Sequence, residues 1–420
     1  MKICIASQTF APQYEGGAEI SARMGAMALG TSHEVCLLAL GSQKDPSATP
    51  GESRTNDGLR LVRIAWSNFY LPTARKPSVS ALGRGAWHMR AATGCVDKEQ
   101  LANFLKREEF DILYVQNAIY FLPDLLAIAQ DLDLPVCLHL RDYAMLCPRT
   151  SMFRDGANCT RPCQSCSLLT YRARRSVGDG RNLTAIAISD FVRQRYLKHG
   201  LLQNAKWHVL HNTNTSQKKF FKSLEKRCGS ESQRFTFGYL GGLVKEKGVE
   251  DLINAFRAIY KKKEARLVIA GRGAQKYETY LRSLVGDAPI EFLGYVNPDI
   301  VYGSADVIVV PSRWHEPQSR VAIESAVYGI PVIAAKTGGL PEVVSENHTG
   351  WCYDPNQPGK LEELMARALT FGQTEWWSQR DINFSGIKGY RGTAEETEYY
   401  ANLEKILVSS HETFRHRSST

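Results

Sequence analysis

The sequence predicts an α/β protein made of two doubly wound domains, and three observations support this. Short, nearly continuous apolar runs alternate with amphipathic helical stretches along most of the 420 residues, as expected for parallel strands buried on both faces and joined by helices. The alternation occurs as two separate blocks. Between them, residues 212–234 are rich in Lys, Ser and Asn and show neither period, which indicates a linker.

The first block predicts a domain of residues 1–212. Its strand-like apolar runs are residues 2–7, 34–40, 59–66, 111–116, 135–140, 184–189 and 207–210. Helical periodicity is expected over residues 17–29, 97–106, 122–131 and 191–199. Gly200 follows the last of these stretches and is typical of the position just after a helix.

The second block predicts a domain of residues 213–393. Its strand-like runs are residues 235–240, 266–270, 290–294, 306–310 and 331–335, and its helices are expected over residues 249–262, 276–285, 319–328 and 359–369. A last helix is expected at about residues 394–408. Open α/β sheets bind ligands at the carboxyl ends of their strands, so we expect the site in the loops there.

Composition and charge narrow the class of protein. Hydrophobic residues make up 43% and charged residues 23%, which excludes a disordered or fibrous chain. The net charge is +9, but residues 149–227 carry sixteen Lys and Arg against four Asp and Glu. Such a segment suits an anionic membrane surface or phosphorylated substrates, or is simply a solvated face. No basic motif interleaved with aromatics occurs, which disfavours binding to nucleic acid.

No signal-peptide core or membrane-length apolar run occurs, so we expect a cytoplasmic protein.

Two glycine-rich turns are candidate anion sites. Gly16 and Gly17 stand between the first strand and its helix, where backbone N–H groups and the helix dipole favour an anion; a tight turn without a ligand is the alternative. The second domain opens with Gly241 and Gly242 after its first strand, and Lys247 stands at the next helix start. Lys247 would neutralise a phosphate, or it is a solvated surface lysine.

The strongest local signal is the stretch HEPQSRVAIE, residues 315–324. Pro317 suits the first turn of a helix, which would leave Glu316 in the loop just ahead. Glu324 would lie about two turns into this apolar helix, where a buried carboxylate needs a partner. The alternative is that Glu316 complements the helix dipole and Glu324 lies on the surface. The N–H groups expected to face an anion belong to Ser319, Arg320 and Val321.

The ordered set of motifs resembles retaining glycosyltransferases of family 4, of the bacterial polysaccharide or lipopolysaccharide type. The residues that carry the resemblance are 12–19, 241–248, 271–273, 292–296, the Glu316…Glu324 element and the tail 329–342. They span nearly the whole chain. The resemblance implies the GT-B fold, with two Rossmann-like doubly wound domains facing a central cleft. The first domain would take the acceptor and the second the donor, and the last helix would return to the first domain.

The resemblance also implies residue roles. Lys247 would bind the donor diphosphate, Glu324 the ribose, and Glu316 the donor sugar near its reacting carbon. The implied donor-binding set is completed by Gly16, Gly17, Gly241, Gly242, Arg272, Tyr295, Val296, Ser319, Arg320 and Val321. The reaction would keep the anomeric configuration without a catalytic metal, using a UDP-, GDP- or ADP-sugar and a saccharide or lipid-linked acceptor. A non-catalytic nucleotide-sugar-binding subunit and a nucleotide-sugar epimerase of the same fold are the alternatives.

Three departures from the family pattern affect this expectation. Gly242 stands where the family usually has Arg, so Lys245 or Arg272 would have to supply that charge. Ser319 stands where the family often has Gly. Arg141 replaces the His of a His-Asp-Tyr motif, and an arginine cannot act as a general base. We therefore expect Arg141 to clamp the donor sugar or an acidic acceptor.

Four cysteines form a C-x11-C-x3-C-x2-C cluster, namely Cys147, Cys159, Cys163 and Cys166. Four thiols in a reducing compartment suggest a tetrahedral structural zinc, although the spacing differs from a two-by-two ribbon. Separate reduced thiols are the alternative.

Because the basic segment, residues 149–227, lies in the acceptor domain and the linker, it would suit a phosphate-bearing lipid carrier or an anionic membrane.

Overall fold

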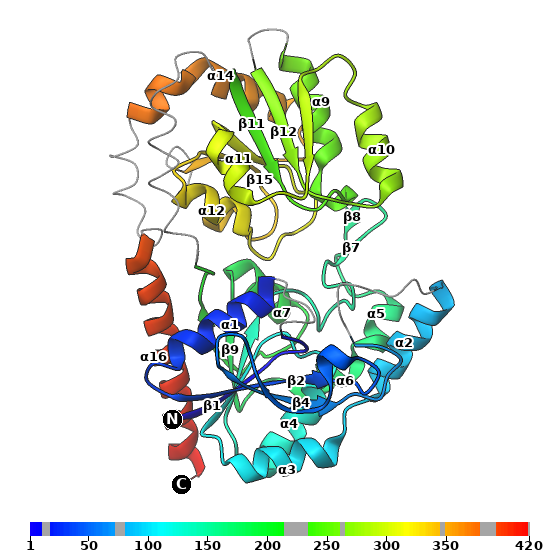
Figure 1. Cartoon of the computed structure of the whole chain (residues 1–420), viewed down its shortest axis with the longest axis vertical. Coiled ribbons are helices and arrows are strands. Elements are labelled where there is room, and N and C mark those ends of the chain that lie inside the picture. Colours follow the sequence, from blue (N-terminus) through cyan, green and yellow to red (C-terminus); the bar gives the residue numbers. More distant parts are fainter. Residues whose placement is uncertain are drawn as a thin grey trace. The chain divides into compact units, whose positions relative to one another are not determined.

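The structure is a computed structural model that describes residues 1–10, 17–71, 80–213, 234–260, 265–344, 349–378 and 392–418. The chain forms two compact units (Figure 1). The first unit combines Met1–Met152, Thr160–His211 and Tyr399–Thr420; the second combines Phe153–Cys159 and Asn212–Glu398. The sequence-based division placed residues 153–159 in the first domain, whereas their contacts place them in the second unit.

The first unit is built on an eight-stranded sheet of order β10-β9-β6-β5-β1-β2-β4-β3. Only the edge strand β3 is antiparallel to its neighbour. The chain winds outward from β1 in both directions, which is the doubly wound arrangement. The strands are β1 (Lys2–Ala6), β2 (Glu34–Gly41), β3 (Gly51–Arg54), β4 (Arg60–Ala65), β5 (Ile112–Val115), β6 (Val136–Leu140), β9 (Leu183–Ala187) and β10 (Lys206–Val209).

The helices of the first unit begin where side chains cap them. The Asp97 side chain accepts a hydrogen bond from the backbone N–H of Gln100 at the start of α3, and Ser189 caps α7 in the same way. The helices are α1 (Gly17–Leu29), α2 (Ala81–Thr93), α3 (Lys98–Glu108), α4 (Leu122–Asp131), α5 (Gln164–Leu169), α6 (Tyr171–Val177) and α7 (Asp190–Lys198), with a short 3-10 turn at Pro46–Ala48.

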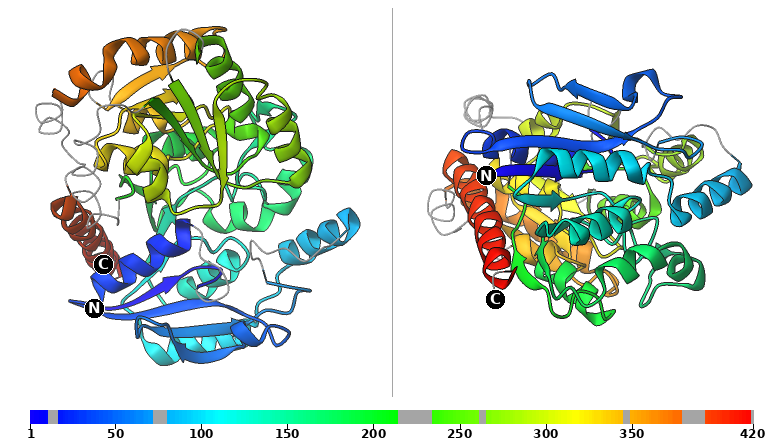
Figure 2. Two further views of the ribbon diagram at one scale, coloured as in Figure 1. Left: turned by 45° about the horizontal axis from the view of Figure 1, so that its top comes forward. Right: turned by 90° about the horizontal axis from the view of Figure 1, so that it is seen from below.

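The C-terminal helix α16 (Gly392–Ser418) packs on the first unit from Tyr399 onward. Tyr399, Leu403 and Leu407 recur every four residues, and all three are buried in the core that contains Ala22 and Ala26 of α1. Figure 2 shows α16 alongside α1. This apolar stripe explains why the chain returns to the first unit after the second is complete.

The second unit is built on a six-stranded, fully parallel sheet of order β13-β12-β11-β14-β15-β16. In chain order this is 3-2-1-4-5-6, the strand order of the dinucleotide-binding doubly wound fold. The strands are β11 (Phe235–Leu240), β12 (Ala265–Ala270), β13 (Ile290–Gly294), β14 (Val307–Val310), β15 (Val332–Ala335) and β16 (Gly350–Tyr353).

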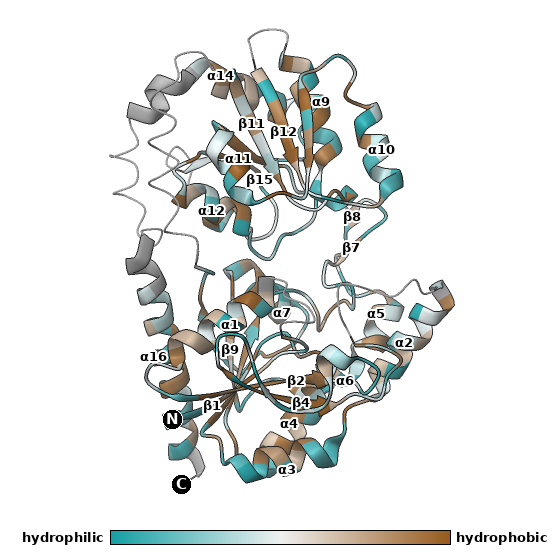
Figure 3. Cartoon of the chain, in the orientation of Figure 1, coloured by the Kyte–Doolittle hydropathy of each residue, from teal (hydrophilic) through white to brown (hydrophobic). Residues whose placement is uncertain are grey.

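Amphipathic helices cover the second sheet. On α9, Val249, Leu252, Ile253 and Phe256 form one buried stripe at helical spacing. Figure 3 shows strand β12 mainly in brown (hydrophobic) and helix α10 mainly in teal (hydrophilic). The helices are α9 (Val249–Ile259), α10 (Gln275–Ser283), α11 (Pro298–Ser304), α12 (Arg320–Val327), α13 (Leu340–Val343) and α14 (Lys360–Ser378), with a short 3-10 turn at Lys245–Lys247.

A small hairpin of β7 (Phe153–Arg154) and β8 (Ala157–Asn158) belongs to the second unit. Its two-residue turn is Asp155-Gly156, and both residues have positive φ, 52° and 82°. A two-residue turn with positive φ at both positions matches the right-handed twist of paired strands, and Asp-Gly is a preferred sequence for it. The sequence alone therefore contained a signal for this hairpin.

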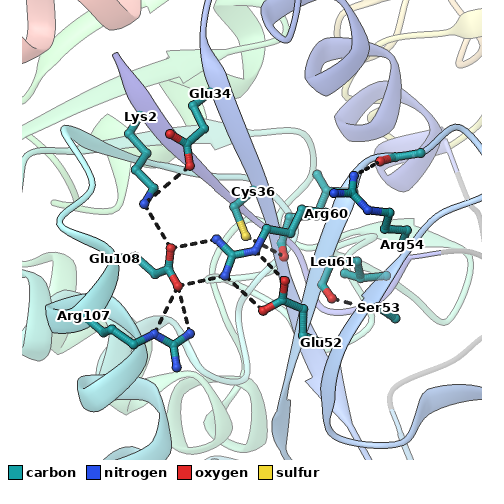
Figure 4. Close-up of polar contacts among 12 residues, drawn as sticks. Lys2, Glu34, Cys36, Glu52, Ser53, Arg54, Arg60, Leu61, Arg107 and Glu108 are labelled. Carbon is teal, nitrogen blue, oxygen red and sulfur yellow. Dashed lines mark hydrogen bonds and ion pairs between the residues drawn. The ribbon is translucent and has the colours of Figure 1, made fainter.

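A charged network ties together the edge of the first sheet (Figure 4). The buried Glu108 carboxylate accepts hydrogen bonds from Arg60 at 2.7 and 2.8 Å, from Lys2 at 3.0 Å and from Arg107 at 2.8 Å. Arg60 also pairs with Glu52 of β3. Hydrogen bonds from Arg60 hold the pKa of Glu108 well below its usual range. The network joins β1, β3, β4 and α3.

Among the residues that the structure describes, no helix combines the length and the apolar character needed to cross a membrane.

Candidate functional site

The second sheet has its topological switch point between β11 and β14. The chain leaves β11 through Gly241–Leu243 and leaves β14 through residues 311–319, so two loops meet at the carboxyl ends of neighbouring strands. Ligands of doubly wound sheets bind at this point. The predicted residues Gly241, Gly242, Lys247, Glu316 and Ser319 all lie on these loops or on the turn that follows β11.

An ion pair between Lys247 and Glu316 lies at this switch point. Lys247 Nζ donates to Glu316 Oε1 at 2.6 Å, and Ser312 Oγ makes a short hydrogen bond to the same oxygen. Glu316 is 4% exposed, whereas the Lys247 side chain is 28% exposed and lies 5.3 Å from the Trp314 ring centroid. Within the described part of the chain Glu316 Oε2 makes no hydrogen bond, so it remains open to a ligand.

The backbone around Glu316 is fixed by the loop after β15. Gly339 N donates to Glu316 O at 2.7 Å. Gly338 has φ 59°, and a Cβ there would lie 2.1 Å from Glu316 O, so only glycine allows this approach. The Thr337 hydroxyl donates to Ser312 O at 3.0 Å. These contacts explain why Gly338 and Gly339 follow strand β15 in the tail motif, residues 329–342.

The glycines after β11 and β12 pack against each other. A Cβ on Gly271 would lie 1.8 Å from Gly241 O, and one on Gly273 would lie 2.1 Å from Leu243 O. The residue types here are therefore set by two backbones in contact, before any ligand is considered. Gly242 is exposed and has open space around it, so an arginine side chain would fit there. Arg272 is also exposed, and its carbonyl accepts a hydrogen bond from the N–H of Leu243, the neighbour of Gly242, at 2.9 Å.

Helix α12 begins later than Pro317 suggests, and this corrects the sequence-based expectation. Ser319 is the N-cap: its side chain accepts from Ala322 N at 3.3 Å, and the helix starts at Arg320. Pro317 therefore lies in the loop and not in the first turn. The Ser319 hydroxyl thus pairs one of the N–H groups at the helix start that have no acceptor within the helix. The backbone N–H groups of Arg320 and Val321 still stand at the start of the helix.

Glu324 has the partners that its apolar helix requires. Tyr302 Oη donates to Glu324 Oε2 at 2.8 Å, and Arg320 Nε lies 3.7 Å from Oε1. The Glu324 side chain is 18% exposed. Burial, and then the neighbouring Glu324 carboxylate, raise the pKa of the Tyr302 hydroxyl well above its usual value. Tyr302 thus remains a neutral donor that orients the carboxylate.

Tyr295 and Val296 follow β13. Tyr295 is 80% exposed, and Val296 is half-buried against the core of the second unit. An exposed aromatic ring next to an anchored residue offers a planar apolar surface, as expected for a segment that contacts a base.

The remaining predicted residues of the binding set belong to the first unit. Gly16 lies outside the described residues, and Gly17 begins α1. Glu19 of this helix is 3% exposed and accepts from Asn117 Nδ2 at 2.8 Å, while Gln8 Nε2 donates to Asn117 Oδ1 at 2.5 Å. Asn117 follows β5 and Gln8 follows β1, so these side chains mark the switch point of the first sheet.

Arg141 lies in a buried polar cluster after β6. Its Nε donates to Gln116 Oε1 at 2.7 Å, and its second amino nitrogen lies 3.4 Å from His139 Nδ1. The Tyr114 hydroxyl contacts the same histidine nitrogen at 2.6 Å. Burial and the adjacent Arg141 lower the pKa of His139, so this histidine stays neutral. The guanidinium is therefore the positive charge of this cluster.

A pocket of the first unit is lined by Arg141, Asp142, Asn117 and His139 together with apolar residues. Burial raises the pKa of Asp142 to about 6, and the Ala144 N–H bonded to its Oδ1 at 2.8 Å counteracts this rise. The pocket thus combines a fixed guanidinium with a carboxyl group that titrates near neutrality.

The cysteine cluster does not form a recognisable metal site. In the described part of the chain, no three or more His, Cys, Asp or Glu side chains are arranged to hold a metal ion. Cys159 belongs to the second unit and the other three cysteines to the first. Burial and the neighbouring Cys163 and Cys147 thiols raise the pKa of Cys166 to about 12. The structure thus gives no support to the structural zinc, which stays a prediction for metal analysis of the purified protein.

The sequence reasoning did not identify Ser312, Trp314 and Tyr302 as residues of the candidate site. Each contacts a predicted residue, as described above. Ser312 and Trp314 lie within four residues of Glu316, directly after a buried strand, which is the signal that would have identified them. No local signal identifies Tyr302, because it reaches Glu324 across 22 residues of sequence.

Comparisons with known proteins agree with this geometry. Residues 221–375 match the family described as "Glycosyl transferases group 1". The chain is 22% identical over 348 residues to an "Uncharacterized 42.6 kDa protein in cps region" of Klebsiella pneumoniae, covering 82% of this chain and 87% of that protein.

Solved structures share the fold over the whole chain. WaaG, described as a glycosyltransferase involved in lipopolysaccharide biosynthesis, superposes with a TM-score of 0.64 at 16% identity, covering 94% of this chain and 98% of WaaG. Anabaena Alr3699/HepE in complex with UDP superposes with a TM-score of 0.60 at 17% identity, covering 100% of both chains. Residues 221–375 thus match a glycosyltransferase group 1 domain, and the chain has the GT-B fold.

Proposed function

We propose that the protein is a retaining glycosyltransferase that uses a nucleotide-sugar donor. The observation that carries this proposal is the Lys247–Glu316 ion pair at the switch point of the second sheet. A half-exposed cation beside a buried carboxylate with one open oxygen provides the two charges that glycosyl transfer requires. The cation stabilises a leaving diphosphate, and the carboxylate stabilises an oxocarbenium-like sugar.

The donor would lie along the loops described above. Its diphosphate would lie at Lys247 and at the N–H groups that begin α12, where the helix dipole adds positive potential. Glu324 would accept from the ribose hydroxyls, with Tyr302 holding it in place. As the bond between the anomeric carbon and the diphosphate breaks, its electron pair leaves with the diphosphate. The acceptor hydroxyl oxygen bonds to the same carbon and its proton passes to the departing diphosphate.

Metal independence and retention are parts of this proposal. Lys247, Arg272 and the helix start would supply the positive charge on the diphosphate, so we expect transfer to continue in excess EDTA. Retention predicts that the new glycosidic bond has the anomeric configuration of the donor, which nuclear magnetic resonance of the product determines. An inverted product would contradict this part of the proposal.

The acceptor would be a saccharide or a lipid-linked saccharide of a surface polysaccharide. The printed descriptions of two similar proteins support this: one lies in a cps region and the other is involved in lipopolysaccharide biosynthesis. The nucleotide would be UDP, GDP or ADP, and HepE binds UDP. We place the acceptor in the first unit, where Arg141 would clamp an acidic group on the acceptor or the donor sugar.

One face of the first unit fits peripheral contact with an anionic membrane. We call it the arginine face: helices α2, α5 and α6, which carry five arginines and no Asp or Glu. Helix α2 contacts both of the others. The face also exposes large apolar side chains, namely Leu82, Met89, Leu168 and Tyr171. Exposed apolar groups among cations are the features of a surface that lies on anionic lipid.

Vesicle sedimentation tests this contact. We expect the protein to sediment with phosphatidylglycerol vesicles at low salt and to be released at high salt, because the attraction is screened. Leu82→Ser with Met89→Ser should weaken binding, whereas Met27→Ser, a similarly exposed methionine on α1, should not. Equal binding to neutral phosphatidylcholine vesicles would contradict the electrostatic part.

A turnover assay tests the function itself. Purified protein with UDP-, GDP- and ADP-sugars should release nucleoside diphosphate from at least one donor, slowly by hydrolysis and faster with an acceptor extract. Binding without release would favour the non-catalytic subunit instead. Conversion of the donor sugar to its epimer would favour the epimerase.

A further inference from the structure

The Asn158 side chain makes two hydrogen bonds to the loop that carries Glu316. Its Nδ2 donates to Arg313 O at 2.8 Å, and its Oδ1 accepts from His315 N at 2.7 Å. The two backbone groups lie on either side of Trp314. One amide side chain therefore pairs with an extended segment as a neighbouring strand would, across 155 residues of sequence.

The same segment is held from its other side by the turn that carries Lys247. Arg313 N and Trp314 N both donate to Glu246 O, at 2.9 and 3.2 Å. The Arg313 guanidinium also makes a short bidentate ion pair with Asp251 of α9. The segment 313–315 is thus bonded both to the Lys247 turn and to the β7–β8 hairpin.

We propose that the β7–β8 hairpin is a positioning element of the donor site, acting through Asn158. By fixing residues 313–315, Asn158 sets where Trp314 lies against Lys247 and where Glu316 enters the site. This inference rests on the proposed function, because it assigns the hairpin to the site where the donor would react. Neither Asn158 nor its hairpin is expected to touch the reacting atoms.

The packing of the hairpin argues against a role in the core alone. None of its four paired residues is buried, and Arg154 and Asp155 pair with each other in solvent at 61% and 85% exposure. A hairpin that buries so little apolar surface contributes little to the hydrophobic stability of the second unit. The two hydrogen bonds of the Asn158 side chain instead hold the loop that carries Glu316.

The test compares Asn158→Ala with Arg154→Ala, a control on the exposed side of the same hairpin. For Asn158→Ala we expect kcat to fall about tenfold or more, because misplacing a reacting group by about 1 Å can cost up to about 10²-fold. The donor KM and the affinity for nucleoside diphosphate should stay within about threefold, because Lys247 and α12 are untouched. Arg154→Ala should match wild type.

The outcomes are distinguishable. Retained nucleotide affinity shows that the second unit of a variant is folded. If Asn158→Ala loses nucleotide affinity, the near-isosteric Asn158→Asp is tested in its place. This variant keeps one of the two hydrogen bonds, and its kcat should also fall. A folded variant with kcat within twofold of Arg154→Ala would overturn the positioning role. A wild-type protein that turns over no donor would refute the proposed function instead.

Discussion

The two units wind their strands in the same way, but different side chains lie at their switch points. In the second unit, a half-exposed lysine pairs with a buried carboxylate on loops that contact each other through glycines. In the first unit, the corresponding position carries the amides Gln8 and Asn117, bonded to the buried Glu19, next to a pocket that is lined by Arg141. The same topology therefore places a lysine–carboxylate pair at one switch point, and at the other amides bonded to a buried carboxylate beside a pocket with an arginine and an aspartate.

The difference indicates a division of labour. A charge that must stabilise a leaving diphosphate needs access to ligand and solvent, as Lys247 has. A charge that orients a substrate is better fixed among buried partners, as Arg141 is. The predictions below test this comparison. It fails if both switch points bind the same ligand.

The largest effect is expected for Arg141→Ala. Transfer to acceptor should be abolished while nucleoside diphosphate affinity, measured by calorimetry, stays unchanged, because the proposed diphosphate site would lie on the second unit. Arg181→Ala is the control, since Arg181 is an exposed arginine of the first unit that pairs with Asp179. Intact transfer by Arg141→Ala would remove the clamp role.

The next effect is expected for Glu316→Gln. This change keeps the shape of the side chain but removes its charge, so kcat should fall about 10²-fold or more, as for other groups that stabilise developing charge. Steady-state kinetics with the best donor measure it. Glu363→Gln, which alters an exposed carboxylate on α14, should leave kcat unchanged. A kcat loss below about threefold for Glu316→Gln would contradict its assignment.

A smaller effect is expected for Glu324→Gln. Loss of a hydrogen bond to a charged group costs about 1.5–3 kcal/mol, so nucleotide affinity should fall about tenfold or more. Transfer at saturating donor should change little if Glu324 binds only the ribose. Calorimetric titration measures the affinity, and an unaltered dissociation constant would place the ribose elsewhere.

The smallest effect concerns stability and belongs to the first unit alone. Glu108→Gln removes one of the two charged partners of the Arg60 guanidinium and leaves Glu52 as the other. This change should reduce the free energy of unfolding by about 1–3 kcal/mol at pH 7. Since the pKa of Glu108 is depressed in the folded protein, its contribution is complete above the unfolded value of about 4.3 and is lost as pH falls below it. Denaturant titrations at pH 7 and pH 3.5 should therefore show a smaller difference between variant and wild type at pH 3.5.

Sequence patterns predicted the α/β class well because buried parallel strands are continuous apolar runs, and β11 and β14 are clear examples. They missed strands β3, β7, β8 and β16 and helices α2, α5, α6, α11 and α13. Helix α2 shows why: its exposed Leu82 and Met89 break the one-sided stripe that identifies an amphipathic helix.

The site was predictable where it is local and not where it is long-range. Lys247 and Glu316 lie directly after strands of the sheet, so chain position alone drew attention to them. The expected bounds of α12, residues 319–328, come within one residue of its start at Arg320. Only Pro317 was wrongly placed in its first turn, because a proline in a loop and a proline at a first helical turn look alike in sequence. Asn158 could not be found, since its role depends on a tertiary contact with residues 313–315.

A thermal-shift panel tests the central claim most directly. Wild type, Lys247→Ala and Arg141→Ala are each heated with saturating UDP, GDP and ADP. Ligand at about a hundred times its dissociation constant stabilises the folded state by about 2.7 kcal/mol, a rise of several degrees in Tm. We predict that at least one nucleotide raises the Tm of wild type and Arg141→Ala but not that of Lys247→Ala. A flat panel for wild type, or equal shifts in all three proteins, would contradict the account.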